Sequence, residues 1–86
     1  MSRHTLRKED LTIAYGYDDM MPPPMGGYFF QVMDKRAVDE EKNPEGIVVN
    51  EGFFGGISKN RMIELMTEHG VENHSHLTMV ALDLPI

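Results

Sequence analysis

The fold is decided by residues 11–35, LTIAYGYDDMMPPPMGGYFFQVMDK, in which two strand patterns flank a proline segment. From Leu11 to Tyr17 every second side chain is apolar and the others are small or polar, which is the period-two pattern of a half-buried strand. Residues 27–35 carry aromatic and apolar side chains on both faces near their start, which is typical of a central strand or an interface. We therefore predict two antiparallel neighbouring strands.

Gly16 lies in the middle of the first of these strands. A glycine inside a strand marks a β-bulge, or a point where a bulky group such as an aromatic ring from a neighbouring strand lies across the backbone. We expect either a bulge or close packing at this position.

Three contiguous prolines, Pro22 to Pro24, lie between the two predicted strands. They lack the P-x-x-P spacing of a polyproline recognition motif, so a ligand role is not favoured. We interpret the segment as a stiff hairpin connection, in which the prolines hold an extended rise and the following glycines let the chain turn back. Rigid prolines would hold Met20, Met21 and Met25 on the rim, where methionine forms an adaptable contact surface.

The clearest helix signal covers residues 58–69. Ser58 is a good N-cap residue, and Ile57 can pack on Met62 as a hydrophobic staple. Gly70 suits the left-handed position that follows the last turn of a helix. The apolar stripe consists of Met62, Ile63, Leu65 and Met66.

The other segments complete a predicted α+β fold. Residues 36–46 are a polar loop, residues 47–49 a short third strand, and residues 77–84, apolar on nearly both sides, an interior fourth strand. Residues 1–10 are expected to be flexible or to form a short helix. The prediction is a single domain over residues 1–86, with a small mixed β-sheet of about four strands in the order β-β-β-α-β and one helix on one face. The third and fourth strands would form a right-handed parallel crossover.

Composition limits the class of protein. A chain of 86 residues allows one domain with one core. The absence of cysteine excludes disulfides and thiolate metal sites and favours a cytoplasmic location. The net charge of −6 disfavours nonspecific attraction to nucleic acid and favours basic partners. The sequence shows neither the apolar segment of a secretory signal nor an apolar run long enough to span a membrane, so we expect no membrane association.

We hypothesise a small acidic non-enzymatic protein that acts through macromolecular interaction, by self-association as a homodimer or by binding a protein partner. One version is an inhibitor or adaptor of the kind carried by phages and plasmids, whose acidic face binds a basic nucleic-acid-binding surface. Direct nucleic-acid binding is not expected, because the aromatic residues at positions 28–30 lack basic neighbours. The predicted interaction surface comprises Met20, Met21, Pro22, Pro23, Pro24, Met25, Phe53 and Phe54.

Two alternatives stay open. His69, His74 and His76 lie close in sequence and could share a metal ion or a small ligand, although their spacing matches no strong ligand pattern. The third hypothesis is a small enzyme that uses Tyr15 or Tyr17 together with carboxylates. The candidate carboxylates are Asp18, Asp19, Asp34, Glu51 and Asp83. The sequence contains no nucleophile-elbow, phosphate-loop or zinc-protease motif, so we expect neither catalysis nor a cofactor.

Overall fold

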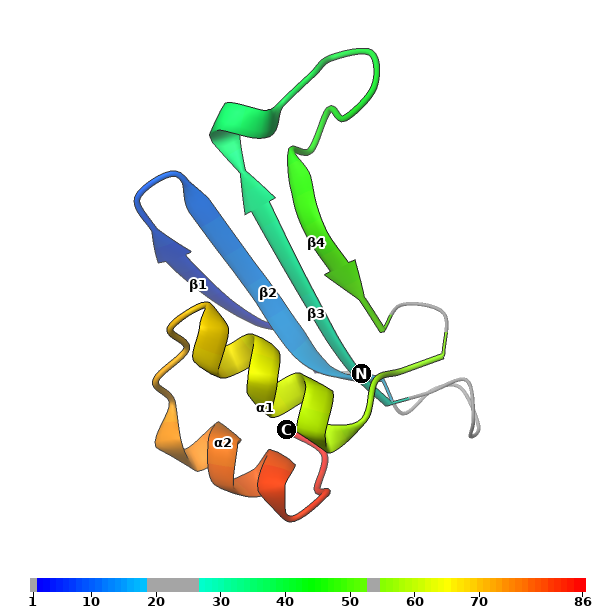
Figure 1. Cartoon of the computed structure of the whole chain (residues 1–86), viewed down its shortest axis with the longest axis vertical. Helices are drawn as coiled ribbons and strands as arrows, with labels where there is room; N and C mark the ends of the chain where they lie inside the picture. Colours follow the sequence, from blue (N-terminus) through cyan, green and yellow to red (C-terminus); the bar gives the residue numbers. More distant parts are fainter. Residues whose placement is uncertain (1, 19–26, 53–54) are drawn as a thin grey trace.

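The computed structural model describes residues 2–18, 27–52 and 55–86 (Figure 1). Its elements, in chain order, are β1 (His4–Lys8), β2 (Leu11–Asp18), β3 (Gly27–Asp34), the short 3₁₀ helix η1 (Lys35–Ala37), β4 (Ile47–Glu51), α1 (Lys59–Glu68) and α2 (His74–Ala81). The strands form one antiparallel sheet in the order β1-β2-β3-β4. The predicted α+β class is confirmed.

The pairing of β2 with β3 confirms the two strands predicted from residues 11–35. Asp18 lies opposite Gly27, so the proline segment connects neighbouring antiparallel strands. The close packing expected at Gly16 is also present. A Cβ atom there would lie 2.2 Å from the carbonyl oxygen of Ser2 and 3.0 Å from Cζ of Phe29. Only glycine fits without a shift of this backbone.

Helix α1 begins and ends where the sequence predicts. The Ser58 hydroxyl accepts a hydrogen bond from the Arg61 N–H at 3.2 Å, which caps the first turn. Gly70 has a φ of +69°, and the N–H of Val71 donates a hydrogen bond to the carbonyl oxygen of Met66 at 2.8 Å. This arrangement closes the C-terminus with a left-handed residue. The side chains that α1 buries are Met62, Leu65 and Met66.

Both helices lie on one side of the sheet, with α1 against the sheet and α2 against α1 (Figure 1). Alternate residues of β2 and β3, such as Ile13 and Phe30, point to this side and are fully buried. The core consists of Ile13, Tyr15, Tyr28, Phe30, Val32, Met62, Leu65, Met66, Val71 and Val80. Tyr15 therefore lies in the core with its hydroxyl directed to the C-terminal part of the chain, where it meets His76.

The predicted fourth strand is wrong. Most of residues 77–84 belong to α2. Asn73 is the N-cap of this helix, and its side chain accepts a hydrogen bond from the His76 N–H at 3.0 Å. Leu82 and Leu84, expected in an interior strand, are 64% and 45% exposed. The parallel crossover is therefore also wrong, and the expected mixed sheet with one helix is an antiparallel sheet with two.

The N-terminal segment also differs from expectation. Residues 4–8 form β1, an edge strand in which Leu6 lies opposite Ile13 and His4 lies opposite Tyr15. A strand with only one large aliphatic side chain is stabilised by its neighbour, because β2 supplies the hydrogen-bonding partners and the apolar surface for Leu6. The sheet thus ends at β1, whose outer side is a free edge within the part of the chain that the structure describes.

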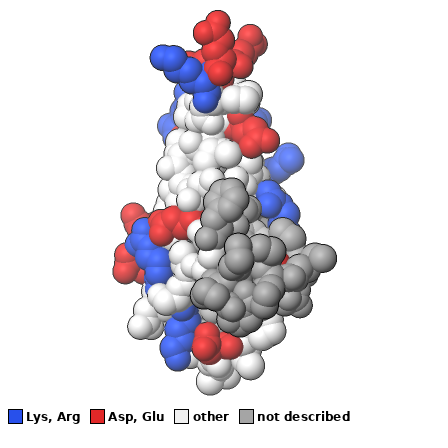
Figure 2. All heavy atoms as spheres, turned by 90° about the vertical axis from the view of Figure 1, so that its right-hand side faces the viewer, with Lys and Arg blue, Asp and Glu red and all other residues white. Residues whose placement is uncertain are grey.

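Charged side chains of both signs are mixed on one side of the molecule. On the side shown in Figure 2, acidic and basic side chains lie next to one another, and neither sign forms a patch of its own. The acidic face that the inhibitor hypothesis requires is therefore not seen on this side. Within residues 2–18, 27–52 and 55–86, no helix is long and apolar enough to cross a membrane.

Candidate functional site

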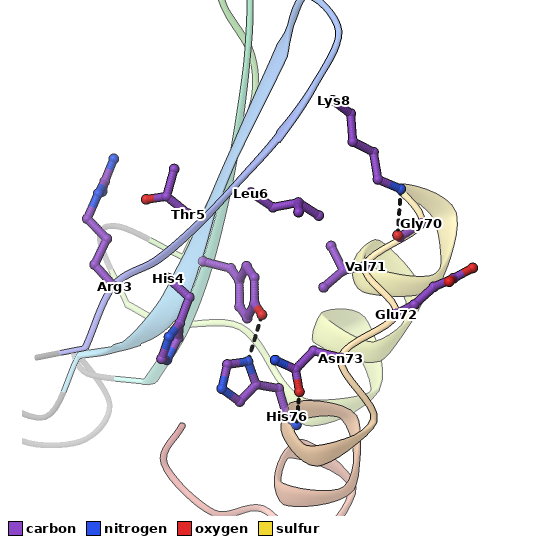
Figure 3. A pocket seen from close by; sticks show the side chains of 11 residues that line it. Arg3, His4, Thr5, Leu6, Lys8, Gly70, Val71, Glu72, Asn73 and His76 are labelled. Atoms are coloured by element: carbon purple, nitrogen blue, oxygen red, sulfur yellow. Dashed lines mark hydrogen bonds between the residues drawn. The ribbon is translucent and has the colours of Figure 1, made fainter.

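A cavity of about 680 Å³ lies between strand β1 and the connection from α1 to α2. We call it the β1 groove. One wall is formed by residues 3–6 and Lys8, the other by residues 70–73 and His76, and Tyr15 also lines it. In Figure 3, Leu6 and Lys8 project from β1 towards the second wall, whereas Thr5 projects to the other side of the sheet. The groove therefore reaches around the free edge of β1.

Among residues 2–18, 27–52 and 55–86, no other strand pairs with the outer edge of β1. The N–H of Ser2 donates to the carbonyl of Tyr17 at 2.9 Å, and the register continues without a break to Lys8 opposite Leu11. In an antiparallel pair, hydrogen-bonded positions recur at every second residue, so the intervening residues turn their N–H and C=O groups outward. Along β1 these outward residues are Arg3, Thr5 and Arg7, and all three are exposed.

Three ring side chains from β1, β2 and α2 meet in the groove. The Tyr15 hydroxyl lies 2.6 Å from Nδ1 of His76. The rings of His4 and His76 are 4.2 Å apart between centroids, and those of His4 and Tyr15 are 5.4 Å apart. Nε2 of His4 is buried and has no hydrogen-bond partner among the described residues. A buried polar atom without a partner is costly, and a bound molecule reaches this nitrogen only if the rings around it move.

Local sequence explains how this cluster forms. Antiparallel pairing places His4 directly beside Tyr15 on the helix-facing side of the sheet. The Asn73 cap fixes the first turn of α2 and therefore the backbone of His76. The cluster thus depends on residues from both ends of the chain.

Burial favours the neutral forms of His76 and Tyr15 in this cluster. Burial lowers the pKa of His76, and the nearby charge of His4 lowers it further. Burial also raises the pKa of Tyr15 above its ordinary value of 10.0. A neutral His76 carries one ring proton, so its Nε2 donates or accepts according to the role that Nδ1 takes with Tyr15.

Lys8 closes one end of the β1 groove. Its Nζ donates a hydrogen bond to the carbonyl oxygen of Gly70 at 2.7 Å (Figure 3). This carbonyl follows the last turn of α1, where a cation is favourable because the helix dipole is negative. The contact holds the α1–α2 connection beside β1.

The three predicted histidine ligands are not brought together. Nδ1 of His69 lies 3.0 Å from the carbonyl oxygen of Leu65, and its ring contacts Phe30. His74 is exposed at the start of α2, and only His76 belongs to the ring cluster. Among the residues that the structure describes, no group of three or more His, Asp or Glu side chains is arranged to hold a metal ion.

The candidate enzyme residues are also dispersed. Asp34 is paired with Arg36 and Glu51 with Arg61, and these hydrogen bonds from arginine lower the pKa of both carboxyl groups. The Tyr17 ring packs edge-on against Tyr28. Of the two tyrosines predicted for catalysis, Tyr15 lines the groove, and His76 lines it as well.

The predicted interaction surface lies outside the described residues. It comprises Met20, Met21, Pro22, Pro23, Pro24, Met25, Phe53 and Phe54. Sequence reasoning missed His4, whose ring contacts both other rings of the cluster. The available signal was the alternation of His4, Leu6 and Lys8 with Thr5 and Arg7, which marks a short strand with one inward face.

Comparison with protein-family models, with curated proteins and with solved structures finds no match to this chain. The β1 groove itself is therefore the basis for inferring the function of the chain.

Proposed function

We propose that this chain is a non-enzymatic interaction protein that binds a partner macromolecule at the β1 groove. The observation that supports this most strongly is a free edge strand lining a cavity of about 680 Å³. An exposed strand edge binds extended polypeptide through backbone hydrogen bonds, and an adjacent pocket selects side chains. The β1 groove offers both features on one side of the molecule.

The chemistry of the groove favours binding over catalysis. A catalytic tyrosine acts through its phenolate or a readily transferred proton, whereas burial raises the pKa of Tyr15. The carboxyl groups of Asp34 and Glu51 are occupied by arginine partners, and neither residue lines the groove. These features support a role in recognition.

Selection from a random peptide library displayed against the folded protein tests this proposal. We expect selected peptides to lose at least about tenfold in affinity in the variant Thr5→Pro, because proline removes the outward N–H of an edge strand. Thr5→Ala keeps that N–H and is expected to weaken binding less. If no peptide is selected, or if selected peptides bind Thr5→Pro as well as the wild type, the proposal is wrong.

A second candidate function is binding of a small ligand or metal ion by the ring cluster. The observation that favours it is Nε2 of His4, which is buried next to the His76 ring and has no hydrogen-bond partner in the described part of the chain. Two imidazoles are fewer than the three protein ligands that zinc sites commonly use, so the remaining ligands would come from water or from a ligand molecule. Calorimetric titration with zinc or nickel should give heat that disappears in His4→Gln. No heat at micromolar protein would exclude this metal site.

A further inference from the structure

We propose that the occupant of the β1 groove is an extended acidic segment of another protein, which adds to β1 as a fifth strand and pairs its carboxylates with Arg3 and Arg7. This inference rests on the proposed function and names the chemistry of the partner. It follows from the direction of the free backbone groups, from the charges beside them and from the side chains inside the groove.

The backbone of β1 specifies an extended partner. The outward N–H and C=O groups belong to alternate residues, Arg3, Thr5 and Arg7, as the register with β2 requires. A helix satisfies its own backbone groups and could not use this edge. An extended segment pairs with all three residues, and each added pair satisfies one N–H and one C=O.

The exposed side chains of Arg3 and Arg7 indicate the charge of the bound segment. Arg3 and Arg7 project on the side of the sheet away from the helices. Arg3 lies two residues before Thr5 in the chain, and Arg7 lies two residues after it. Among the described residues, no carboxylate forms an ion pair with either of them. Arg3 makes one long hydrogen bond of 3.5 Å, to Oε1 of Gln31. Carboxylates at alternate positions of an added strand would lie directly opposite these two guanidinium groups.

Charge also argues against a second copy of the chain as the occupant. In a twofold antiparallel pairing centred on Thr5, Arg3 of one copy would lie opposite Arg7 of the other, and the reverse. Like charges directly opposite one another across strands are destabilising. An acidic segment of a different protein replaces both repulsions with attractions.

The side chains inside the groove indicate which side chains the bound segment carries on its other face. Leu6 and Val71 give apolar contact from the two walls. His4 also lines the cavity, and its Nε2 is buried and has no hydrogen-bond partner among the described residues. The side chains that alternate with the carboxylates should therefore be apolar, and one polar group among them could satisfy His4.

The test uses a fluorescently labelled synthetic peptide of alternating glutamate and valine, titrated against the folded protein at low salt. We expect saturable binding and slower amide exchange at Arg3, Thr5 and Arg7. The variant Arg3→Gln with Arg7→Gln should weaken binding about tenfold. The matched control, Lys42→Gln with Lys59→Gln, removes two exposed lysines elsewhere and should bind like the wild type. Added salt should weaken binding.

Two control peptides are tested against the wild-type protein, so their results do not depend on whether a variant folds. A peptide of alternating lysine and valine should not bind, and a glutamate and valine peptide with methylated backbone nitrogens should bind at least about tenfold more weakly. Equal binding of the lysine peptide, or no effect of methylation, would overturn the inference. Dimerisation that sedimentation detects and that Thr5→Pro abolishes would also overturn it, in favour of a second copy.

The library selection and the glutamate and valine peptide together distinguish an error in the acidic partner from an error in the proposed function, on which this inference rests. If library peptides bind in a manner that depends on Thr5 but the glutamate and valine peptide does not bind, the interaction function stands and the acidic partner is wrong. If neither kind of peptide binds, both are wrong.

Discussion

The hydroxyl of Tyr15 and Nδ1 of His76 lie 2.6 Å apart although the residues are 61 positions apart in the chain. A second long-range contact is similar, because the Tyr28 hydroxyl donates to the carbonyl of Leu84 at 2.6 Å. Each tyrosine buries its ring in the core and uses its hydroxyl to hold the C-terminal segment. The position of α2, and hence one wall of the β1 groove, depends on these two contacts.

Removing the Tyr15 hydroxyl should destabilise the protein. In Tyr15→Phe the Nδ1 of His76 loses its partner in a partly buried site, which costs about 1 to 3 kcal/mol. Urea denaturation measures the free energy of unfolding. Tyr17→Phe is the matched control, since no hydrogen bond of the Tyr17 hydroxyl is found within the described residues. Equal losses in the two variants would show that the Tyr15–His76 contact does not stabilise the fold.

The stability of the protein should fall as the pH drops below the ordinary histidine pKa of 6.5. Burial and the charge of His4 lower the pKa of His76 in the folded state. Between the folded pKa and 6.5, the unfolded chain binds more protons than the folded protein, so the free energy of unfolding rises with pH. This contribution is complete above 6.5 and is lost as the pH falls through that window.

Melting temperatures measured from about pH 7.5 to about pH 5.5 check this dependence. His76→Gln removes the titrating group, so the fall in melting temperature over this range should be smaller than in the wild type. A variant that loses as much as the wild type would assign the effect to other groups.

Gly16→Ala should detach the N-terminal end of β1. The new Cβ would lie 2.2 Å from the carbonyl oxygen of Ser2, so the hydrogen bond from Ser2 to Tyr17 would break. We expect a loss of about 1 to 3 kcal/mol, together with faster amide exchange in β1. In a chain shortened by residues 1 and 2 the same substitution should cost less. An equal cost in the shortened chain would instead implicate the contact with Phe29.

The ion pair between Arg61 and Glu51 joins α1 to β4. Nε of Arg61 donates to Oε1 of Glu51 at 2.9 Å and Nη2 donates to Oε2 at 2.6 Å, which is a bidentate geometry. Both side chains are about a third exposed, so we expect a coupling of only about 0.5 to 1 kcal/mol. A double-mutant cycle with Arg61→Gln and Glu51→Gln measures it. The same cycle with the more exposed Glu64 should give a smaller value.

The elements that the sequence predicts correctly have their signals within the element. Strand β2 shows clean alternation from Leu11 to Tyr17, and α1 combines a cap at Ser58, an apolar stripe and a terminal Gly70. Strand β1 lacks such a signal, because its stability comes from pairing with β2 and from burial of Leu6. The ring cluster could not be predicted for the same reason, since His4 lies in that strand.

The error at α2 has a different cause. Residues 77–84 are apolar at nearly every position, and a short apolar run fits a strand and a helix equally well. The helix buries Val80 fully and Leu77 partly, which is the spacing of one helical face. The deciding signal was Asn73, a favourable N-cap residue immediately before the segment.

Asn73 should therefore control both α2 and the ring cluster. Asn73→Ala removes the acceptor for the His76 N–H, now at 3.0 Å, and should lower the free energy of unfolding by about 1 kcal/mol. Frayed first-turn residues would also move His76 away from Tyr15, so Asn73→Ala and Tyr15→Phe should cost less together than the sum of their separate effects. Asn73→Asp keeps the side-chain oxygen and should retain most of the stability. Additive losses in the double variant would mean that the cap and the Tyr15–His76 contact act independently.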